Sequence, residues 1–285
     1  MRILLTGRDG QVGWELERAL TPLGELIATD RGALDLADAD AIRRVMRETK
    51  PEVIVNAAAY TAVDRAETEP ELAMRINGIA PGVLAEEAKR LSALLMHYST
   101  DYVFDGTKSS PYIETDVPNP INAYGRSKLV GERAIEVVGG AHLILRTSWV
   151  YAPRGKNFFL TIANKARAGE ALRVVNDQSG TPTSAAFLAT STAALLRRSD
   201  GAALRGVYHL VPFGETTWCG FARAIVAALD ARVDVAAIAS KEFSTPAARP
   251  VNSVLDANRI ARDFGVERPA WETLLTDCVA SYLRT

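Results

Sequence analysis

The sequence RILLTGRDGQVG occupies residues 2–13 and decides the expected fold. Residues 2–6 form the apolar run of a buried strand, and Gly7, Gly10 and Gly13 follow before a helical pattern that starts at Trp14. Glycines at this spacing permit a tight turn and let backbone N–H groups approach a pyrophosphate at the positive end of a helix. A strand, a glycine turn and a helix in this order predict a dinucleotide-binding site.

Apolar runs and helical patterns alternate along the first half of the chain. Further runs cover residues 25–29, 52–57, 93–99 and 142–147, and the helical patterns cover residues 14–22, 38–49 and 71–89. Alternation of this kind produces right-handed β-α-β units, which place parallel strands in one sheet. We therefore predict an α/β fold with a Rossmann-type doubly wound parallel sheet.

The character of the sequence changes after residue 151. Segments rich in Pro, Gly and Asn alternate there with helical patterns at residues 158–168, 185–197 and 217–229. We predict an NAD(P)-binding Rossmann domain at residues 1–150 and a smaller C-terminal substrate-binding domain at residues 151–285. Segments around residues 174–185 and 205–212 are expected to return to the first domain.

Tyr124 and Lys128 form a Tyr-x-x-x-Lys pattern. On a helix such a pair lies on one face, so the Lys128 ammonium can approach the Tyr124 hydroxyl and favour its ionised form. We expect the pKa of Tyr124 to fall toward working pH, where a general acid is most effective. Thr100 would offer a hydroxyl to the same substrate oxygen, and Asn77 is a candidate for supporting Lys128 through water. We predict that Thr100, Tyr124 and Lys128 are catalytic.

Asp30 closes the second apolar run, about 20 residues beyond the glycine turn, where a carboxylate usually holds the adenosine ribose. Such a carboxylate favours NAD and repels the 2′-phosphate of NADP, whereas Arg8 and Arg31 could bind that phosphate. The two arginines could equally be solvated surface charges. The expected cofactor is NADPH or NADH, with the preference left open.

Composition favours an ordinary enzyme over several other classes. The 285 residues carry a net charge of -1, which gives no basic surface for nucleic acid. No apolar run is long enough to span a bilayer and no signal sequence is visible, so we expect no membrane partner and a cytoplasmic location. Cys219 and Cys278 are expected to be reduced, and His97, His142 and His209 to be structural.

Six runs of the sequence together resemble one known family. They are GQVG at 10–13, NAAAYTAVD at 56–64, STDYVF at 99–104, YGRSK at 124–128, RTSWVY at 146–151 and RPVNS at 249–253. The combination spans nearly the whole chain and closely resembles the dTDP-4-dehydrorhamnose reductases, which are extended short-chain dehydrogenases/reductases. The resemblance implies the last step of dTDP-L-rhamnose synthesis, in which hydride passes from a nicotinamide to C4 of a keto sugar nucleotide. It also implies that Tyr124 donates the proton, and that Lys128 tunes Tyr124 and binds the nicotinamide ribose.

The same resemblance implies binding positions. Cofactor contacts fall on Gly10, Gln11, Val12, Asp30, Asp35, Leu36, Ala59, Tyr60, Thr61 and Tyr98, and substrate contacts fall on Thr100, Asp101, Tyr124 and Trp149. Trp149 would be an apolar wall against the deoxysugar, or else a core tryptophan. Arg249 would pair with the nucleotide diphosphate, or else hold the C-terminal loop in place.

Metal-dependent dimer formation is where the sequence departs from the family pattern. Some members dimerise through a metal held by several glutamates, and Glu15 matches one of them. The stretch at residues 183–187 has alanine where a second glutamate would be expected. We therefore leave a homodimer open, assign no metal residue and regard Mg2+ as doubtful.

Other functions fit parts of the pattern. A dehydratase or epimerase on the same fold would recycle its cofactor, but dehydratases place Asp-Glu after the threonine, whereas Asp101 and Tyr102 follow Thr100 here. A reductase of another dTDP-4-keto-6-deoxy sugar would have almost the same sequence. A non-catalytic nucleotide-binding subunit resembling the regulatory subunit of methionine adenosyltransferase would share the fold, although the intact Thr100, Tyr124 and Lys128 disfavour it.

Overall fold

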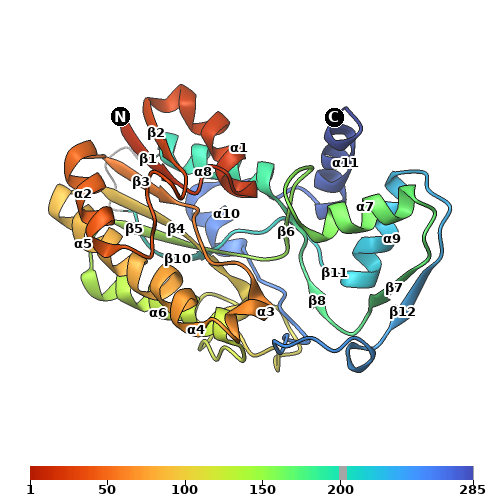
Figure 1. Cartoon of the computed structure of the whole chain (residues 1–285). Coiled ribbons are helices and arrows are strands. Elements are labelled where there is room, and N and C mark those ends of the chain that lie inside the picture. Colours follow the sequence, from red (N-terminus) through yellow and green to blue (C-terminus); the bar gives the residue numbers. More distant parts are fainter. Residues whose placement is uncertain (199–203, 285) are drawn as a thin grey trace.

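A parallel six-stranded sheet forms the centre of the protein (Figure 1). The structure, a computed structural model, describes residues 1–198 and 204–284. The strands follow the spatial order β2 (Glu25–Thr29), β1 (Arg2–Thr6), β3 (Val53–Asn56), β4 (Leu94–Thr100), β5 (His142–Thr147) and β10 (Arg205–His209). All neighbouring strands in this sheet pair in parallel. The predicted doubly wound α/β fold is confirmed.

Helices cover both faces of the sheet. One face packs against α1 (Gln11–Leu20), α8 (Ala185–Arg198) and α10 (Asn258–Phe264), and the other against α2 (Ala39–Thr49), α5 (Ala80–Leu91) and α6 (Ala123–Val138). Ile3 and Leu5 of β1 lie in the first core, whereas Leu4 lies in the second. Because both faces are buried, the strands are continuous apolar runs and do not alternate with polar residues.

Two helical segments differ from the prediction. α1 begins at Gln11, earlier than predicted, because Gly10 takes the extended backbone of an N-cap, with φ -71° and ψ 165°. The segment predicted at residues 71–89 consists of α4 (Pro70–Ala73), the π-helical η2 (Met74–Ile79) and α5. Pro81 has no N–H to donate to the carbonyl of Asn77, and the loss of this bond explains the π-helical turn before it.

A second hydrophobic core lies beside the sheet, to the right in Figure 1. It contains α7 (Phe158–Arg167), α9 (Trp218–Ala228), α11 (Trp271–Tyr282) and the paired strands β7 (Leu172–Val175) and β12 (Val235–Ile238). Outside the six-stranded sheet, β8 (Ser179–Gly180) pairs with β11 (Thr216–Thr217), and β9 (Thr183–Ser184) pairs with β6 (Val150–Tyr151). β10, which belongs to the second half of the chain, returns to the six-stranded sheet and pairs with β5. The division of the chain near residue 150 stays a prediction.

Short helical turns connect these elements. They are η1 (Thr21–Leu23), α3 (Val63–Ala66), η3 (Asp101–Val103) and η4 (Ser240–Glu242). η3 follows β4 directly and therefore lies at the carboxyl edge of the sheet. In the part of the chain that the structure describes, no helix has the length and apolar character needed to cross a membrane.

Candidate functional site

A cavity of about 640 Å³ lies at the carboxyl ends of β1, β3, β4 and β5. Its lining contains the catalytic, cofactor-binding and substrate-binding residues predicted from the sequence, with the exception of Arg249. They are Gly7, Gly10, Gln11, Val12, Asp30, Arg31, Asp35, Leu36, Ala59, Tyr60, Thr61, Tyr98, Thr100, Asp101, Tyr124, Lys128 and Trp149. Open parallel sheets bind their ligands at this edge.

The glycine turn between β1 and α1 leaves no room for a side chain at Gly7 or Gly13. Gly7 has φ +77°, and a Cβ there would lie 2.8 Å from backbone atoms of Ala58. A Cβ on Gly13 would overlap the carbonyl oxygen of Gly7. Gln11 and Val12, the first residues of α1, line the cavity. The turn fits a pyrophosphate, because N–H groups and the positive dipole end at a helix N-terminus attract anions.

The predicted adenosine end of the cavity offers both signs of charge. Asp30 and Arg31 line it, and the Arg31 guanidinium lies 3.8 Å from the carboxylate of Asp35. Arg8 instead pairs with Glu17 at 2.9 Å and lies outside the lining. Oδ1 of Asp30 accepts the N–H of Ala33 at 2.8 Å. A carboxylate and an arginine thus both line this end of the cavity, and the preference between the two cofactors stays open.

Tyr124, on α6, hydrogen-bonds with Thr100, which is 5% exposed. Burial raises the pKa of Tyr124 to about 12, and the Thr100 hydrogen bond only partly opposes this. The expected lowering of this pKa is therefore wrong for this structure, because the lost hydration of the phenolate dominates the shift. The phenol stays protonated at neutral pH, which is the form that can donate a proton.

Lys128 is 2% exposed and lies one turn beyond Tyr124 on α6. Its amine donates to the backbone carbonyl of Tyr98 at 2.7 Å and lies 3.3 Å from Nε2 of His97. Burial lowers the pKa of Lys128 to about 8, although the charge of Glu132 partly raises it. His97, which we expected to be structural, thus contacts a predicted catalytic residue, and no spacing in the sequence indicated it.

Asp101 is 3% exposed and begins η3. Burial raises the pKa of its carboxyl to about 7, while hydrogen bonds from Ser253 and Thr100 oppose the shift. The Thr100 hydroxyl donates to Oδ1 of Asp101 at 3.0 Å. A carboxyl with this pKa exists in both forms near neutral pH, so it can accept a hydrogen bond from a ligand hydroxyl or donate one.

Trp149 forms one wall of the cavity together with Trp218, which the sequence analysis missed. The two indoles stack with centroids 3.6 Å apart and an interplanar angle of 8°. Trp149 has φ +46°, a left-handed backbone that is rare for a bulky residue. A Cβ on Gly180 would overlap the Trp149 indole. Backbone strain of this kind persists where the surroundings fix it, and it is frequent at functional sites.

Arg249 lies outside the lining of the cavity. Its guanidinium bonds to both carboxylate oxygens of Asp64, at 3.0 and 2.9 Å, and to the carbonyl of Ala247 at 2.9 Å. In this arrangement it fastens the C-terminal loop to α3, one of the two roles considered from the sequence. Its contact with a nucleotide diphosphate stays a prediction.

Asn77, in η2, fastens the loop after β3 to α6. Its Oδ1 accepts the N–H of Tyr60 at 2.8 Å, and its Nδ2 donates to the Tyr60 carbonyl at 2.9 Å and to the Ser127 hydroxyl at 3.0 Å. These bonds fix the backbone of Tyr60, and with it Thr61, at the cavity wall. Support of Lys128 by Asn77 through water stays a prediction.

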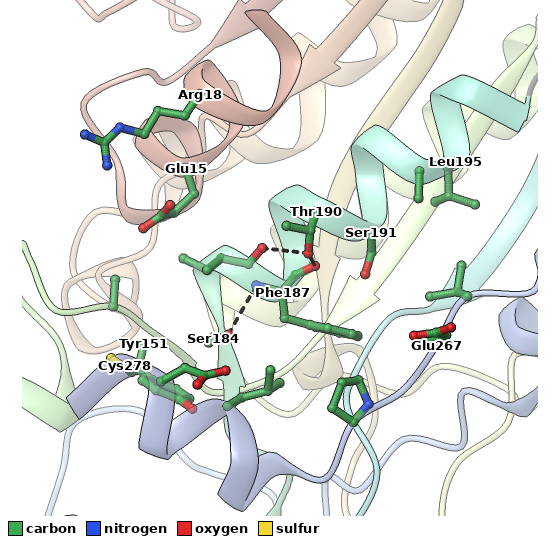
Figure 2. Close-up of a pocket in the computed structure, with 18 of the residues that line it drawn as sticks. Glu15, Arg18, Tyr151, Ser184, Phe187, Thr190, Ser191, Leu195, Glu267 and Cys278 are labelled. Carbon is green, nitrogen blue, oxygen red and sulfur yellow. Dashed lines mark hydrogen bonds between the residues drawn. The ribbon is translucent and has the colours of Figure 1, made fainter. Parts of the chain in front are cut away.

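A second cavity, of about 570 Å³, lies between α1, α8 and α11 (Figure 2). Glu15 projects toward it from α1, and Ala185 and Ala186 line it from α8. Burial raises the pKa of Glu15, while Arg18 and Arg154 partly lower it. Residues 1–198 and 204–284 contain no cluster of three His, Cys, Asp or Glu side chains that could hold a metal. A metal that binds Glu15 therefore stays in doubt.

Comparisons with known proteins extend over nearly the whole chain. The family model described as RmlD substrate binding domain matches residues 1–284. Proteins named dTDP-4-dehydrorhamnose reductase from Burkholderia thailandensis and Escherichia coli K12 are 47% and 44% identical and cover 99% and 95% of this chain and of their own. A crystal structure of dTDP-4-dehydrorhamnose reductase from Bacillus anthracis in complex with NADP is 34% identical, with a TM-score of 0.93, over 98% of this chain and 99% of its own.

Proposed function

Because the chain belongs to the dTDP-4-dehydrorhamnose reductase family, we propose that it reduces the C4 keto group of dTDP-4-dehydro-β-L-rhamnose to dTDP-β-L-rhamnose. The reductant is NADPH or NADH, and the reaction is the last step of dTDP-L-rhamnose biosynthesis. The observation that carries the proposal is that Thr100, Tyr124 and Lys128 share one cavity with the glycine turn. Reduction of a carbonyl needs a hydride donor and a proton donor at the same group, and the cavity has places for both.

The cofactor would lie along the carboxyl edge of the sheet. Gly7, Gly10, Gln11 and Val12 would hold the pyrophosphate, Asp30, Arg31, Asp35 and Leu36 the adenosine, and Ala59, Tyr60, Thr61, Tyr98, Tyr124 and Lys128 the nicotinamide half. The lack of space for a Cβ at Gly7 supports a close approach of the pyrophosphate to the backbone. When bound, the cofactor supplies the hydride for C4 of the sugar.

The sugar would lie against Thr100, Asp101, Tyr124 and Trp149. As C4 gains the hydride, O4 gains negative charge, and the Tyr124 phenol gives its proton to O4. The high pKa of Tyr124 suits this order of events, because the phenol keeps its proton until a more basic alkoxide forms. The Thr100 hydroxyl, which donates to Asp101 in the structure, would turn to donate its proton to the same oxygen.

The remaining contacts concern the outer parts of the substrate and the setting of the enzyme. The Trp149 indole would cover the apolar side of the deoxysugar, and Arg249 would approach the nucleotide diphosphate from its place beside Asp64.

We place the enzyme in the cytoplasm, where the buried free thiols of Cys219 and Cys278 would stay reduced. A homodimer stays a prediction.

The test is loss of reduced-nicotinamide absorbance when the purified protein meets dTDP-4-dehydro-L-rhamnose, with NADPH and NADH in separate reactions. NMR of the product should identify dTDP-L-rhamnose, and the two rates rank the cofactors. A protein that binds nucleotide and oxidises neither cofactor with this sugar contradicts the proposal. Turnover of another 4-keto-6-deoxy sugar would then identify a related reductase, and no turnover at all would favour a regulatory subunit.

A further inference from the structure

Three buried polar side chains form a row across the sheet and end at Lys128. Thr6, Asn56 and His97 are register partners on β1, β3 and β4, and each is 1% exposed. The Thr6 hydroxyl lies 2.6 Å from Oδ1 of Asn56, and Nδ2 of Asn56 lies 2.9 Å from Nδ1 of His97. Nε2 of His97 lies 3.3 Å from the amine of Lys128. The row thus joins the end of β1, where the glycine turn starts, to a predicted catalytic residue.

The direction of these hydrogen bonds follows from what each group can donate. The backbone N–H of Ala58 donates to the Thr6 hydroxyl at 3.3 Å, and this hydroxyl gives its only proton to Oδ1 of Asn56. The NH₂ of the Asn56 amide therefore faces Nδ1 of His97, which must accept. A neutral imidazole that accepts at Nδ1 carries its proton at Nε2, the nitrogen beside Lys128.

The His97 ring has no second proton to offer. Burial is the largest of the effects that hold the pKa of His97 well below its usual value. A neutral ring with its proton on Nε2 can bond to Lys128 only when the lysine is an uncharged amine with a free electron pair. An ammonium at the same place would face the Nε2–H group, so two hydrogen-bond donors would repel each other.

Other charges around Lys128 do not replace this interaction. The titratable side chains that line the cavity near Lys128 are those of Tyr98, Asp101, Tyr102 and Tyr124. Glu132, one turn beyond Lys128 on α6, lies outside the lining and is paired with Arg146 of β5 at 2.6 Å. The Tyr98 carbonyl accepts a proton from the Lys128 nitrogen in either form and binds the ammonium more strongly. The His97 contact, in which Nε2–H is the donor, acts in the opposite direction and favours the uncharged amine.

We propose that Thr6, Asn56 and His97 are positioning residues, which hold the His97 ring as its Nε2–H form and thereby favour the uncharged amine of Lys128. An amine held in this way can take up a proton from the Tyr124 side of the cavity and release it near neutral pH. Only this last step rests on the proposed function, because the protonation of Lys128 is a property of the enzyme by itself.

The first test is the position of the ring proton in the wild-type enzyme. Long-range ¹H–¹⁵N spectra of protein with labelled histidine distinguish the two neutral forms, and single substitutions assign the three histidines. The proposal expects a neutral His97 ring with its proton on Nε2 at neutral pH. A proton on Nδ1, or a charged imidazolium, would overturn it.

The second test changes the far end of the row and observes Lys128. In Thr6→Val, the Asn56 amide is free to turn its oxygen toward His97, so Nε2 becomes an acceptor for an ammonium. The titration midpoint of Lys128, followed by its ε-carbon resonance and assigned with Lys128→Met, should rise by about one pH unit, a tenfold change in the protonation equilibrium. Thr6→Ser keeps the hydroxyl and should keep the wild-type midpoint.

Thr29→Val is the matched control. Thr29 is the register partner of Thr6 on β2, is 6% exposed, and donates its hydroxyl to the carbonyl of Leu5, outside the row. A midpoint that moves equally in Thr6→Val and Thr29→Val, or in neither, overturns the proposal. If Thr6→Val does not fold, the position of the ring proton on His97 in the wild-type enzyme tests the proposal by itself. Neither readout needs turnover, so a protein without reductase activity would contradict the proposed function and leave this test intact.

Discussion

Asp101 and Lys128 are two buried groups of the cavity that titrate near neutral pH. Burial is the first cause of both shifts, raising the pKa of Asp101 to about 7 and lowering that of Lys128 to about 8. Both pKa values therefore lie within about one unit of neutral pH, where each group can gain or lose its proton. A site of this kind can move protons without a large change in its buried charge.

The Asp101 carboxyl should make stability depend on pH. In the folded protein the Asp101 carboxyl keeps its proton up to about pH 7, whereas in the unfolded chain it loses this proton near the ordinary pKa of 3.8. The folded state therefore binds more protons between these two pH values. Stability from this group is therefore present at low pH and lost as pH rises through 7, at roughly 1.4 kcal/mol per pH unit. Asp101→Asn cannot titrate, and its stability relative to wild type should rise between pH 4 and pH 7.

Urea unfolding of both proteins at several pH values measures this difference, since the other carboxyls titrate alike in both and cancel. A difference that is the same at pH 5 and pH 7 would mean that Asp101 is ionised in the folded protein throughout this range.

Lys128→Met should leave the fold intact, because an apolar chain of similar length replaces a buried amine. Turnover and cofactor affinity should both fall, turnover by about 10²-fold, the scale of losing a group in acid–base catalysis. Steady-state kinetics and a titration with NADPH measure the two effects. Unchanged cofactor affinity would show that the amine does not bind the nicotinamide ribose.

At the scale of single elements, β8 and α9 together hold Trp149. Gly180→Ala would place a methyl group inside the Trp149 indole, so the ring must leave its stack on Trp218. We expect KM for the sugar nucleotide to rise about tenfold, the effect of losing about 1.4 kcal/mol of aromatic contact. Cofactor affinity is the internal control, and an unchanged KM would place the sugar away from Trp149.

The pairing of α6 with β5 depends on a buried ion pair. Glu132 accepts two hydrogen bonds from Arg146, at 2.9 and 2.6 Å, and both side chains are nearly inaccessible. Glu132→Gln leaves the Arg146 charge buried without its partner and should destabilise the protein by about 3–5 kcal/mol. Asp40→Asn, which breaks an exposed pair with Arg43, should change stability by less than about 1 kcal/mol. Equal losses in urea unfolding would contradict this contrast.

The sequence predicts these elements best where the pattern is local. Residues 2–6 and 142–147 are apolar because helices cover both faces of the sheet, and this pattern is visible without a structure. The break of the helix at η2 depends on a single missing N–H at Pro81, and the helical periodicity around it hides the effect. Periodicity therefore predicts where an element lies better than it predicts the geometry within it.

At the scale of the whole molecule, the carboxyl edge of the sheet gathers the site. Parallel strands end at one edge, so Gly7, Asp30 and Thr100 meet there, and their approach follows from the predicted sheet. Trp218 and His97 could not be predicted in the same way. Trp218 packs against the second core, and His97 contacts Lys128 because α6 packs against β4, which the sequence does not state.

The direction of the Tyr124 pKa shift also depends on the assembled molecule. The spacing of Tyr124 and Lys128 predicts a lowered pKa for Tyr124, but burial by the surrounding elements dominates and raises this pKa to about 12. The amount of water left around a side chain is a property of the folded chain and not of its local spacing.

The most direct measurement compares the wild-type protein with Tyr124→Phe in the reaction of NADPH with dTDP-4-dehydro-L-rhamnose, with cofactor binding measured on the same samples. The substitution removes one hydroxyl, so the fold and NADPH affinity should survive. We predict that the wild-type protein forms dTDP-L-rhamnose and that turnover by the variant is lower by about 10²-fold or more. Turnover of the variant near the wild-type rate would show that Tyr124 is not the proton donor, and no turnover by the wild type would contradict the reductase itself.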